Sequence, residues 1–131
     1  MDIIAIVPAR SKSKGIRNKN ITTLNGKPLI TYTFVAAKKS VHIKRIILTT
    51  DSKEYANIAS NFGVESPFLR PSNLSGDNVP MLPVIRHTVE FLKNHENYTP
   101  EHIILLTPTC PLRSTQHIDE AIVKYKKGYA Y

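Results

Sequence analysis

The chain has 131 residues, of which 41% are hydrophobic and 21% charged, a length and composition that fit one globular domain with its own core. Lys and Arg number 18 against 10 Asp and Glu, so the formal net charge is +8 and an anionic partner is expected. No apolar stretch is long enough for a membrane span or a signal-peptide core, and the single cysteine, Cys110, cannot form an internal disulfide, so we expect a cytoplasmic protein that does not bind membranes.

The first predicted element is a buried parallel strand at the start of the chain. Asp2 to Val7 is apolar and rich in β-branched residues, and Pro8 is expected to end it. We expect this strand to be central. Residues 8–20 contain Ser, Lys, Gly and Asn without periodicity and predict a loop, and Asn25-Gly26 predicts a tight turn.

A helix follows from Pro28, which suits the first helical position, to about Lys39. A second buried strand is predicted over Arg45–Thr50, and Ser52 is placed to cap a helix that runs through Ala59 and stops at Gly63. The predicted buried face of the first helix consists of Leu29, Ile30, Phe34, Val35 and Ala37.

The rest of the chain continues the alternation of strands and helices. Val64–Phe68 is a candidate short strand, and residues 70–77 form a turn-rich loop before a helix over about Met81–Asn94. A third buried strand is predicted over His102–Thr107, and a last helix over about Thr115–Lys127.

This alternation predicts an α/β fold with a mostly parallel sheet and helices on both faces. Ligands of such sheets bind beyond the carboxyl ends of the strands. The segments expected there are 8–20, 50–52 and 107–114. An open sheet of so few strands is thinly built, so we expect it to be completed by a partner or to be part of something larger.

The loop after the first strand carries the strongest signal for a function. Five basic residues fall within ten positions that hold no acid, namely Arg10, Lys12, Lys14, Arg17 and Lys19. Spaced cations and backbone N–H groups in a loop that follows a buried strand are typical of a phosphate site. The glycine spacing of a Walker loop or a dinucleotide-binding loop is absent. A solvated basic loop is the alternative.

The same residues carry a resemblance to a known family. The pattern Pro8-Ala9-Arg10, then Ser13-Lys14-Gly15, then Lys19-Asn20 resembles the opening signature of the acylneuraminate cytidylyltransferases (CMP-N-acetylneuraminic acid synthetases). Further segments agree in order and spacing, so the resemblance covers nearly the whole chain: Leu24–Leu29, Thr50-Asp51, Phe62–Val64, Leu69–Pro71 and Leu106–Arg113.

The resemblance implies a Rossmann-like three-layer sandwich of the nucleotide-diphospho-sugar transferase type, with residues 1–131 as one nucleotide-binding domain whose C-terminal part is missing. It also implies a reaction in which CTP and an acidic nine-carbon sugar, a nonulosonic acid of the sialic type, give the CMP-sugar and pyrophosphate. The choice among sialic, legionaminic and pseudaminic acid stays open.

The resemblance also implies roles for individual residues. Arg10 and Lys19 would be catalytic and offset charge as pyrophosphate leaves. Arg70 would read the cytosine side, and Arg113 would help to hold the loop after the third strand. The full set implied to contact CTP is Ala9, Arg10, Ser13, Lys14, Gly15, Lys19, Asn20, Arg70, Thr107, Pro108 and Thr109.

Mg²⁺ is the cofactor that the resemblance implies. Relatives hold it with an Asp-x-Asp pair, and no two aspartates of this chain have that spacing. Asp51, at a predicted strand end, is a weak candidate for a water-mediated contact, and a capping or turn role is its alternative.

Three rival functions are carried forward. A catalytically impaired CTP-binding module, acting as a homodimer or completed by another chain, would keep the basic loop without turnover. A 3-deoxy-manno-octulosonate cytidylyltransferase would act on an eight-carbon acid instead. A nucleic-acid binder rests on the charge of +8 alone, because the chain has no recognised motif or aromatic stacking platform for it.

Overall fold

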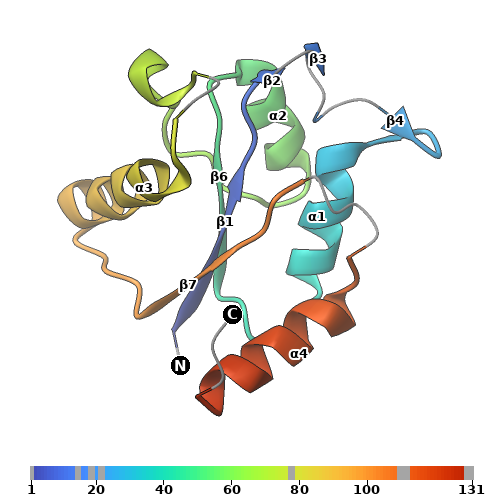
Figure 1. The fold of residues 1–131 in the computed structure, drawn as a ribbon, viewed down its shortest axis with the longest axis vertical. Helices are drawn as coiled ribbons and strands as arrows, with labels where there is room; N and C mark the ends of the chain where they lie inside the picture. The colour runs from blue at the N-terminus through green and yellow to red at the C-terminus, as the bar shows by residue number, and fades with distance from the viewer. Residues whose placement is uncertain are drawn as a thin grey trace.

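The computed structural model describes residues 2–13, 16–17, 20, 23–76, 79–108 and 113–128. Its centre is a three-stranded parallel sheet in the order β6-β1-β7 (Figure 1). Strand β1 spans Ile3–Pro8, β6 spans Arg45–Thr49 and β7 spans His102–Leu105. The predicted central position of the first strand is therefore confirmed. The strand includes Pro8, one residue beyond its predicted end, where proline has no N–H to continue the ladder.

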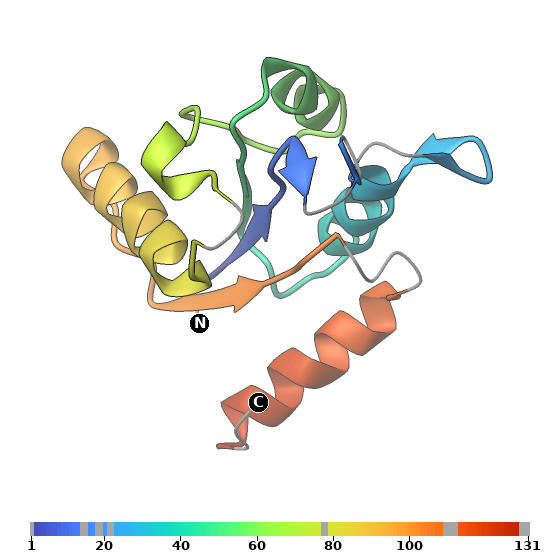
Figure 2. The same cartoon turned by 45° about the horizontal axis from the view of Figure 1, so that its top comes forward.

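In the part of the chain that the structure describes, four α-helices cover the two faces of this sheet (Figures 1 and 2). They are α1 (Leu29–Lys38), α2 (Lys53–Asn61), α3 (Met81–Glu96) and α4 (Thr115–Lys126). No helix in the described ranges combines the length and the apolar character needed to cross a membrane.

Alternate side chains of β1 point to the two faces and divide the core. Ile3 and Val7 belong to a cluster with buried residues of α1, α2 and α4, whereas Ile4 and Ile6 pack with Leu92 of α3. All six residues of β1 are buried, because helices lie on both sides. The structure is thus the predicted three-layer arrangement.

Two small hairpins lie between β1 and α1. Strands β2 (Lys12–Ser13) and β3 (Ile16–Arg17) pair antiparallel within the segment predicted as a loop. Strands β4 (Thr23–Leu24) and β5 (Lys27–Pro28) enclose the turn predicted at Asn25-Gly26. Both turn residues have the positive φ that a tight hairpin of this kind requires, 52° and 79°.

The predicted start and buried face of α1 need correction. Pro28 precedes the helix instead of occupying its first position. Val35 is 39% exposed, whereas Ile30, Phe34 and Ala37 are buried. These three residues are spaced by four and three positions and form one helical stripe, and Val35 lies beside it.

The candidate strand over Val64–Phe68 is reduced to a single bridge between Glu65 and Ile47. Pro67 follows two positions later and has no N–H for a longer ladder. A short 3₁₀ helix, η2 (Ser72–Leu74), lies in the predicted loop before α3. The predicted cap of α2 is confirmed, because the Ser52 hydroxyl accepts a hydrogen bond from the Tyr55 N–H at 3.3 Å.

Candidate functional site

The carboxyl ends of the three strands lie at one edge of the sheet, because all three run parallel. Ala9 and Arg10 follow β1, Asp51 follows β6, and Thr107 and Pro108 follow β7. This edge is where ligands of open parallel sheets bind. The predicted meeting of the three segments is confirmed for the part of each that the structure describes.

The beginning of the loop after β1 is tied to the end of β6. The Ala9 N–H donates to the Thr49 carbonyl oxygen at 3.0 Å. The Ser11 N–H donates to Asp51 Oδ1 at 2.7 Å, and the Ser11 hydroxyl donates to Asp51 Oδ2 at 2.9 Å. Both oxygens of the Asp51 carboxylate are therefore engaged by one residue of the loop.

Asn20, at the other end of this loop, contacts the beginning of the loop. Its side chain is buried, and Nδ2 donates to the Arg10 carbonyl oxygen at 3.0 Å. Its backbone is hydrogen-bonded to the hydroxyl of Tyr55 on α2. The two ends of the basic segment are thus held together above the end of β6. We refer to residues 9–20 as the basic loop.

Arg70 lies buried beside this loop, with 7% of its surface exposed. Its guanidinium donates to the Thr49 carbonyl oxygen at 2.8 Å, to the Thr49 hydroxyl at 3.2 Å and to the Leu74 carbonyl oxygen at 3.2 Å. Burial lowers the pKa of Arg70, the carboxylate of Asp51 opposes this, and the charge of Arg10 lowers it further. Two guanidinium groups and one carboxylate therefore interact at this edge of the sheet.

The segment after β7 provides the third wall. Pro108 is buried and Thr107 is half-buried. Nη2 of Arg113 donates to the Thr107 carbonyl oxygen at 2.5 Å, the holding contact that the resemblance implied for this arginine. Because β1 lies between β6 and β7, Thr107 and Asp51 flank the start of the basic loop from opposite sides.

The structure brings together several of the residues that sequence reasoning assigned to the site, namely Ala9, Arg10, Asn20, Asp51 and Arg70. Lys14, Gly15, Lys19 and Thr109 lie outside the described residues, as does the side chain of Ser13. The assigned roles of all these residues stay predictions.

Sequence reasoning did not assign three residues of the site, namely Ser11, Thr49 and Tyr55. Each acts through a contact with a residue at least 21 positions away in the chain. A signal existed only for Tyr55, which is the third residue of a capped helix that follows a predicted ligand-binding strand end.

A magnesium cage is not found among the described residues, which contain no group of three or more His, Cys, Asp or Glu side chains placed to hold a metal ion. The described residues therefore provide no cage of their own for the implied Mg²⁺, and no step below passes through it.

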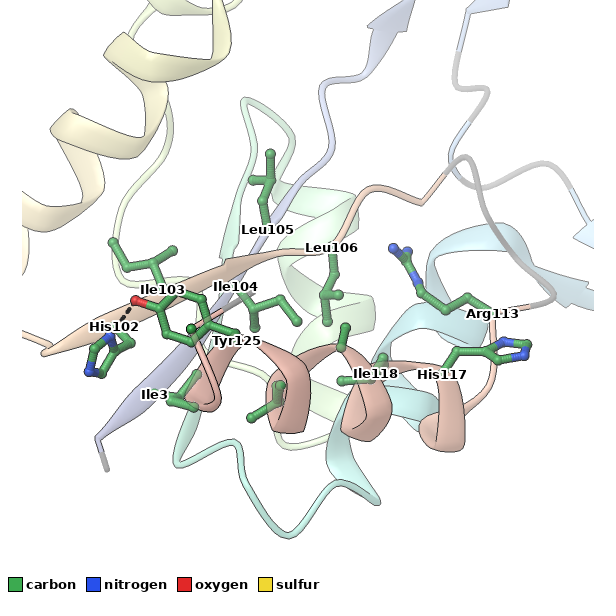
Figure 3. Close-up of a pocket in the computed structure, with 13 residues that line it drawn as sticks. Ile3, His102, Ile103, Ile104, Leu105, Leu106, Arg113, His117, Ile118 and Tyr125 are labelled. Carbon is green, nitrogen blue, oxygen red and sulfur yellow. Dashed lines mark hydrogen bonds between the residues drawn. The ribbon is translucent and has the colours of Figure 1, made fainter. Parts of the chain in front are cut away.

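A cavity of about 780 Å³ lies away from the basic loop, between β7 and α4 (Figure 3). Its walls are mostly aliphatic and include Ile104 and Ile118. At one end the Tyr125 hydroxyl and His102 Nδ1 are 2.6 Å apart, and Arg113 lies toward the other end. An apolar cavity of this kind does not suit a triphosphate, which needs cations and N–H donors.

Burial of Tyr55 predicts a loss of stability in alkali. Burial, with the carboxylates of Asp51 and Glu54, raises the pKa of its hydroxyl from 10.0 to about 12. Between these values the unfolded chain loses a proton that the native protein keeps, so the free energy of unfolding falls as pH rises, by about 2–3 kcal/mol in total. Urea unfolding from pH 9 to 12 measures this.

Tyr55→Phe supplies the control for that measurement. Tyr98, whose pKa is also raised to about 12, remains in both proteins, so the difference between them isolates Tyr55. We expect the variant to lose less stability over this range. Equal slopes for the two proteins would contradict the shift.

The comparisons with known proteins agree with this geometry. The family model described as Cytidylyltransferase matches residues 4–131. The chain therefore belongs to the cytidylyltransferase family, and the resemblance drawn from the opening loop is confirmed.

Two similar relatives are an N-acylneuraminate cytidylyltransferase and a CMP-N,N'-diacetyllegionaminic acid synthase. The chain is 42% identical over 124 residues to the N-acylneuraminate cytidylyltransferase of Escherichia coli O18:K1:H7, which covers 95% of this chain and 28% of that protein. It is 36% identical to the CMP-N,N'-diacetyllegionaminic acid synthase of Legionella pneumophila, covering 96% of this chain and 54% of that one. The chain thus spans about half, or less, of the length of these relatives.

Solved structures confirm the fold. CMP:2-keto-3-deoxy-manno-octonic acid synthetase complexed with CTP superposes with a TM-score of 0.76 at 15% identity, over 97% of this chain and 48% of that one. A cytidylyltransferase from Leptospira borgpetersenii superposes with a TM-score of 0.68 at 18% identity, over 95% and 48%. The Rossmann-like nucleotide-sugar transferase fold is therefore confirmed.

Proposed function

We propose that this chain binds CTP at the carboxyl edge of its sheet and forms the nucleotide-binding part of a cytidylyltransferase that activates a nonulosonic acid. The observation that carries this proposal is the basic loop directly after the central strand, whose two ends are joined by the hydrogen bond from Asn20 to Arg10 near the buried Arg70. Membership of the cytidylyltransferase family selects CTP among the nucleotides that such a loop can hold.

The reaction requires the protein to position the sugar against CTP and to supply positive charge. The anomeric hydroxyl of the sugar attacks the α-phosphorus of CTP, the bond to the bridging oxygen breaks, pyrophosphate leaves with the electron pair, and the hydroxyl proton passes to water. No nucleophilic side chain is needed. Arg10 and Lys19 serve to offset the charge that develops on pyrophosphate. Arg70 serves to keep the wall beside the cytosine in place.

The sugar is proposed as a nonulosonic acid because three similar relatives are named for such substrates. Besides the two relatives above, the pseudaminic acid cytidylyltransferase of Campylobacter jejuni is 34% identical over 125 residues. It covers 95% of this chain and 53% of that protein. The similarity to the solved CMP:2-keto-3-deoxy-manno-octonic acid synthetase concerns the fold and does not bear on the choice of sugar.

Three further properties complete the proposal. We place the activity in the cytoplasm, where CTP is made, and assign Mg²⁺ as the ion that accompanies the triphosphate. We also propose that a further chain or a second copy contributes to the working enzyme, because the open parallel sheet that the structure describes has only three strands.

Calorimetric titration with CTP, ATP and GTP in the presence of Mg²⁺ tests the nucleotide. We expect CTP to bind at least about tenfold more tightly than either purine nucleotide, a difference of about 1.4 kcal/mol. Equal affinities would contradict the proposal, since a loop that recognised only phosphates would not discriminate.

Pyrophosphate release from CTP tests the sugar. Release that requires N-acetylneuraminic, legionaminic or pseudaminic acid supports a cytidylyltransferase. CTP binding without release under any of these acids would reduce the proposal to its rival, a CTP-binding unit without turnover.

A further inference from the structure

The segment that follows β6 contacts the basic loop at both of its ends. Asp51 accepts two hydrogen bonds from Ser11, at 2.7 and 2.9 Å, near the beginning of the loop. Tyr55, four positions after Asp51, is hydrogen-bonded to the backbone of Asn20 at the end of the basic loop. Asn20 in turn donates to the carbonyl oxygen of Arg10 at 3.0 Å. Arg10 is therefore adjacent to the anchored Ser11, and its carbonyl oxygen is held by the anchored Asn20.

We propose that Asp51 is a positioning residue for the CTP site, which together with Tyr55 holds the basic loop in the shape that receives the triphosphate. The proposal rests on the proposed function. It assigns to Asp51 neither metal binding nor contact with the substrate. Its effect on CTP passes through Ser11 and the placement of Arg10.

Three other roles for Asp51 are disfavoured by its surroundings. Capping of α2 is performed by Ser52, whose hydroxyl accepts from the Tyr55 N–H. Metal binding would require further ligands beside it, and the described residues contain no group of three or more His, Cys, Asp or Glu placed to hold a metal ion. Asp51 also does not serve as a general charge partner on the surface, because it is half-buried and both of its oxygens accept hydrogen bonds from Ser11.

A reason for such an anchor lies in the charge of the loop. Its sequence holds five cations and no acid, so mutual repulsion opposes the hydrogen bond that joins its two ends, from Asn20 to the Arg10 carbonyl oxygen. The two hydrogen bonds from Ser11 to Asp51 at the base of the loop fix its backbone against this repulsion before the ligand arrives. A ligand that finds the competent shape only part of the time binds more weakly in proportion.

Titration of Asp51 variants with CTP tests the positioning role. We expect Asp51→Ala to weaken CTP binding about tenfold, as for a loop that is competent about a tenth of the time. Asp51→Asn keeps an acceptor for the Ser11 N–H and should recover most of the affinity. Glu54→Gln, which removes a nearby exposed carboxylate in the first turn of α2, is the matched control and should change little.

Combination with Arg10→Ala shows whether the effect passes through the loop. If Asp51 positions Arg10, its replacement by alanine costs much less in the Arg10→Ala background than in the wild type, because coupled residues are not additive. Fully additive losses would overturn the proposal. So would a rank order in which Asp51→Asn binds as weakly as Asp51→Ala.

The amide signal of Ser11 separates this inference from the proposed function. In ¹H–¹⁵N spectra without nucleotide, we expect the Ser11 amide proton to move upfield in Asp51→Ala, since its carboxylate acceptor is gone. An unmoved signal would overturn the anchor whatever CTP does. If the wild type bound no CTP, the proposed function would fail, and a moved signal would still establish that Asp51 holds the loop.

Discussion

Arg70→Ala is expected to lower the free energy of unfolding by about 2–4 kcal/mol. Arg70 is buried, with 7% of its surface exposed, and its guanidinium donates to two carbonyl oxygens and one hydroxyl. Each hydrogen bond from a charged donor contributes about 1.5–3 kcal/mol, and the desolvation that lowers the pKa of Arg70 offsets part of the sum.

Loss of these local hydrogen bonds should lower the free energy of unfolding of the whole domain. Without the guanidinium, the Thr49 carbonyl oxygen at the end of β6 and the Leu74 carbonyl oxygen in η2 lose a donor. Arg70→Lys should recover little, because an ammonium group cannot reproduce the planar fork that reaches both. This separates the geometry of the side chain from its charge.

Urea unfolding measures this prediction, with Arg86→Ala as the control. Arg86 is an exposed arginine on α3, so its replacement removes the same charge and should change stability by less than about 0.5 kcal/mol. Equal unfolding midpoints for the two variants would show that the buried network of Arg70 does not stabilise the fold.

Arg10→Ala is expected to weaken CTP binding about tenfold to a hundredfold, or about 1.5–3 kcal/mol, as for the loss of one charge-assisted contact to phosphate. Arg10 lies at the start of the basic loop, directly after the central strand, and its positive charge lowers the pKa of the buried Arg70. Lys124→Ala on α4 removes the same charge from an exposed position on another element and should have little effect.

Much of the fold could be predicted because local patterns determine it. The apolar, β-branched runs identified the parallel strands β1, β6 and β7, and Ser52 marked the start of α2. The strand predicted as buried over His102–Thr107 is wrong in burial and length, because β7 ends at Leu105 and lies at an edge of the sheet with its four residues half-buried or exposed. Predictions failed where a neighbour in space decided the outcome. Val35 has the apolar character of a core residue but lies beside the stripe that faces the sheet.

The site was predictable in position and less so in its connections. The order of strands and loops placed the basic loop, Asp51 and Thr107 at one edge, and the structure agrees. The bonds from Ser11 to Asp51 join residues that are 40 positions apart, and nothing in the local sequence marks them. Arg70 was assigned to the cytosine side by resemblance, whereas its described contacts join β6 to η2.

The measurement that tests the central claim most directly is a calorimetric titration of the wild type, Arg10→Ala and Lys124→Ala with CTP under identical salt and Mg²⁺. The account predicts that the wild type and Lys124→Ala bind CTP alike and that Arg10→Ala binds it about tenfold to a hundredfold more weakly. Equal losses in the two variants would mean that general positive charge attracts the nucleotide, and the basic loop after β1 would not be its site.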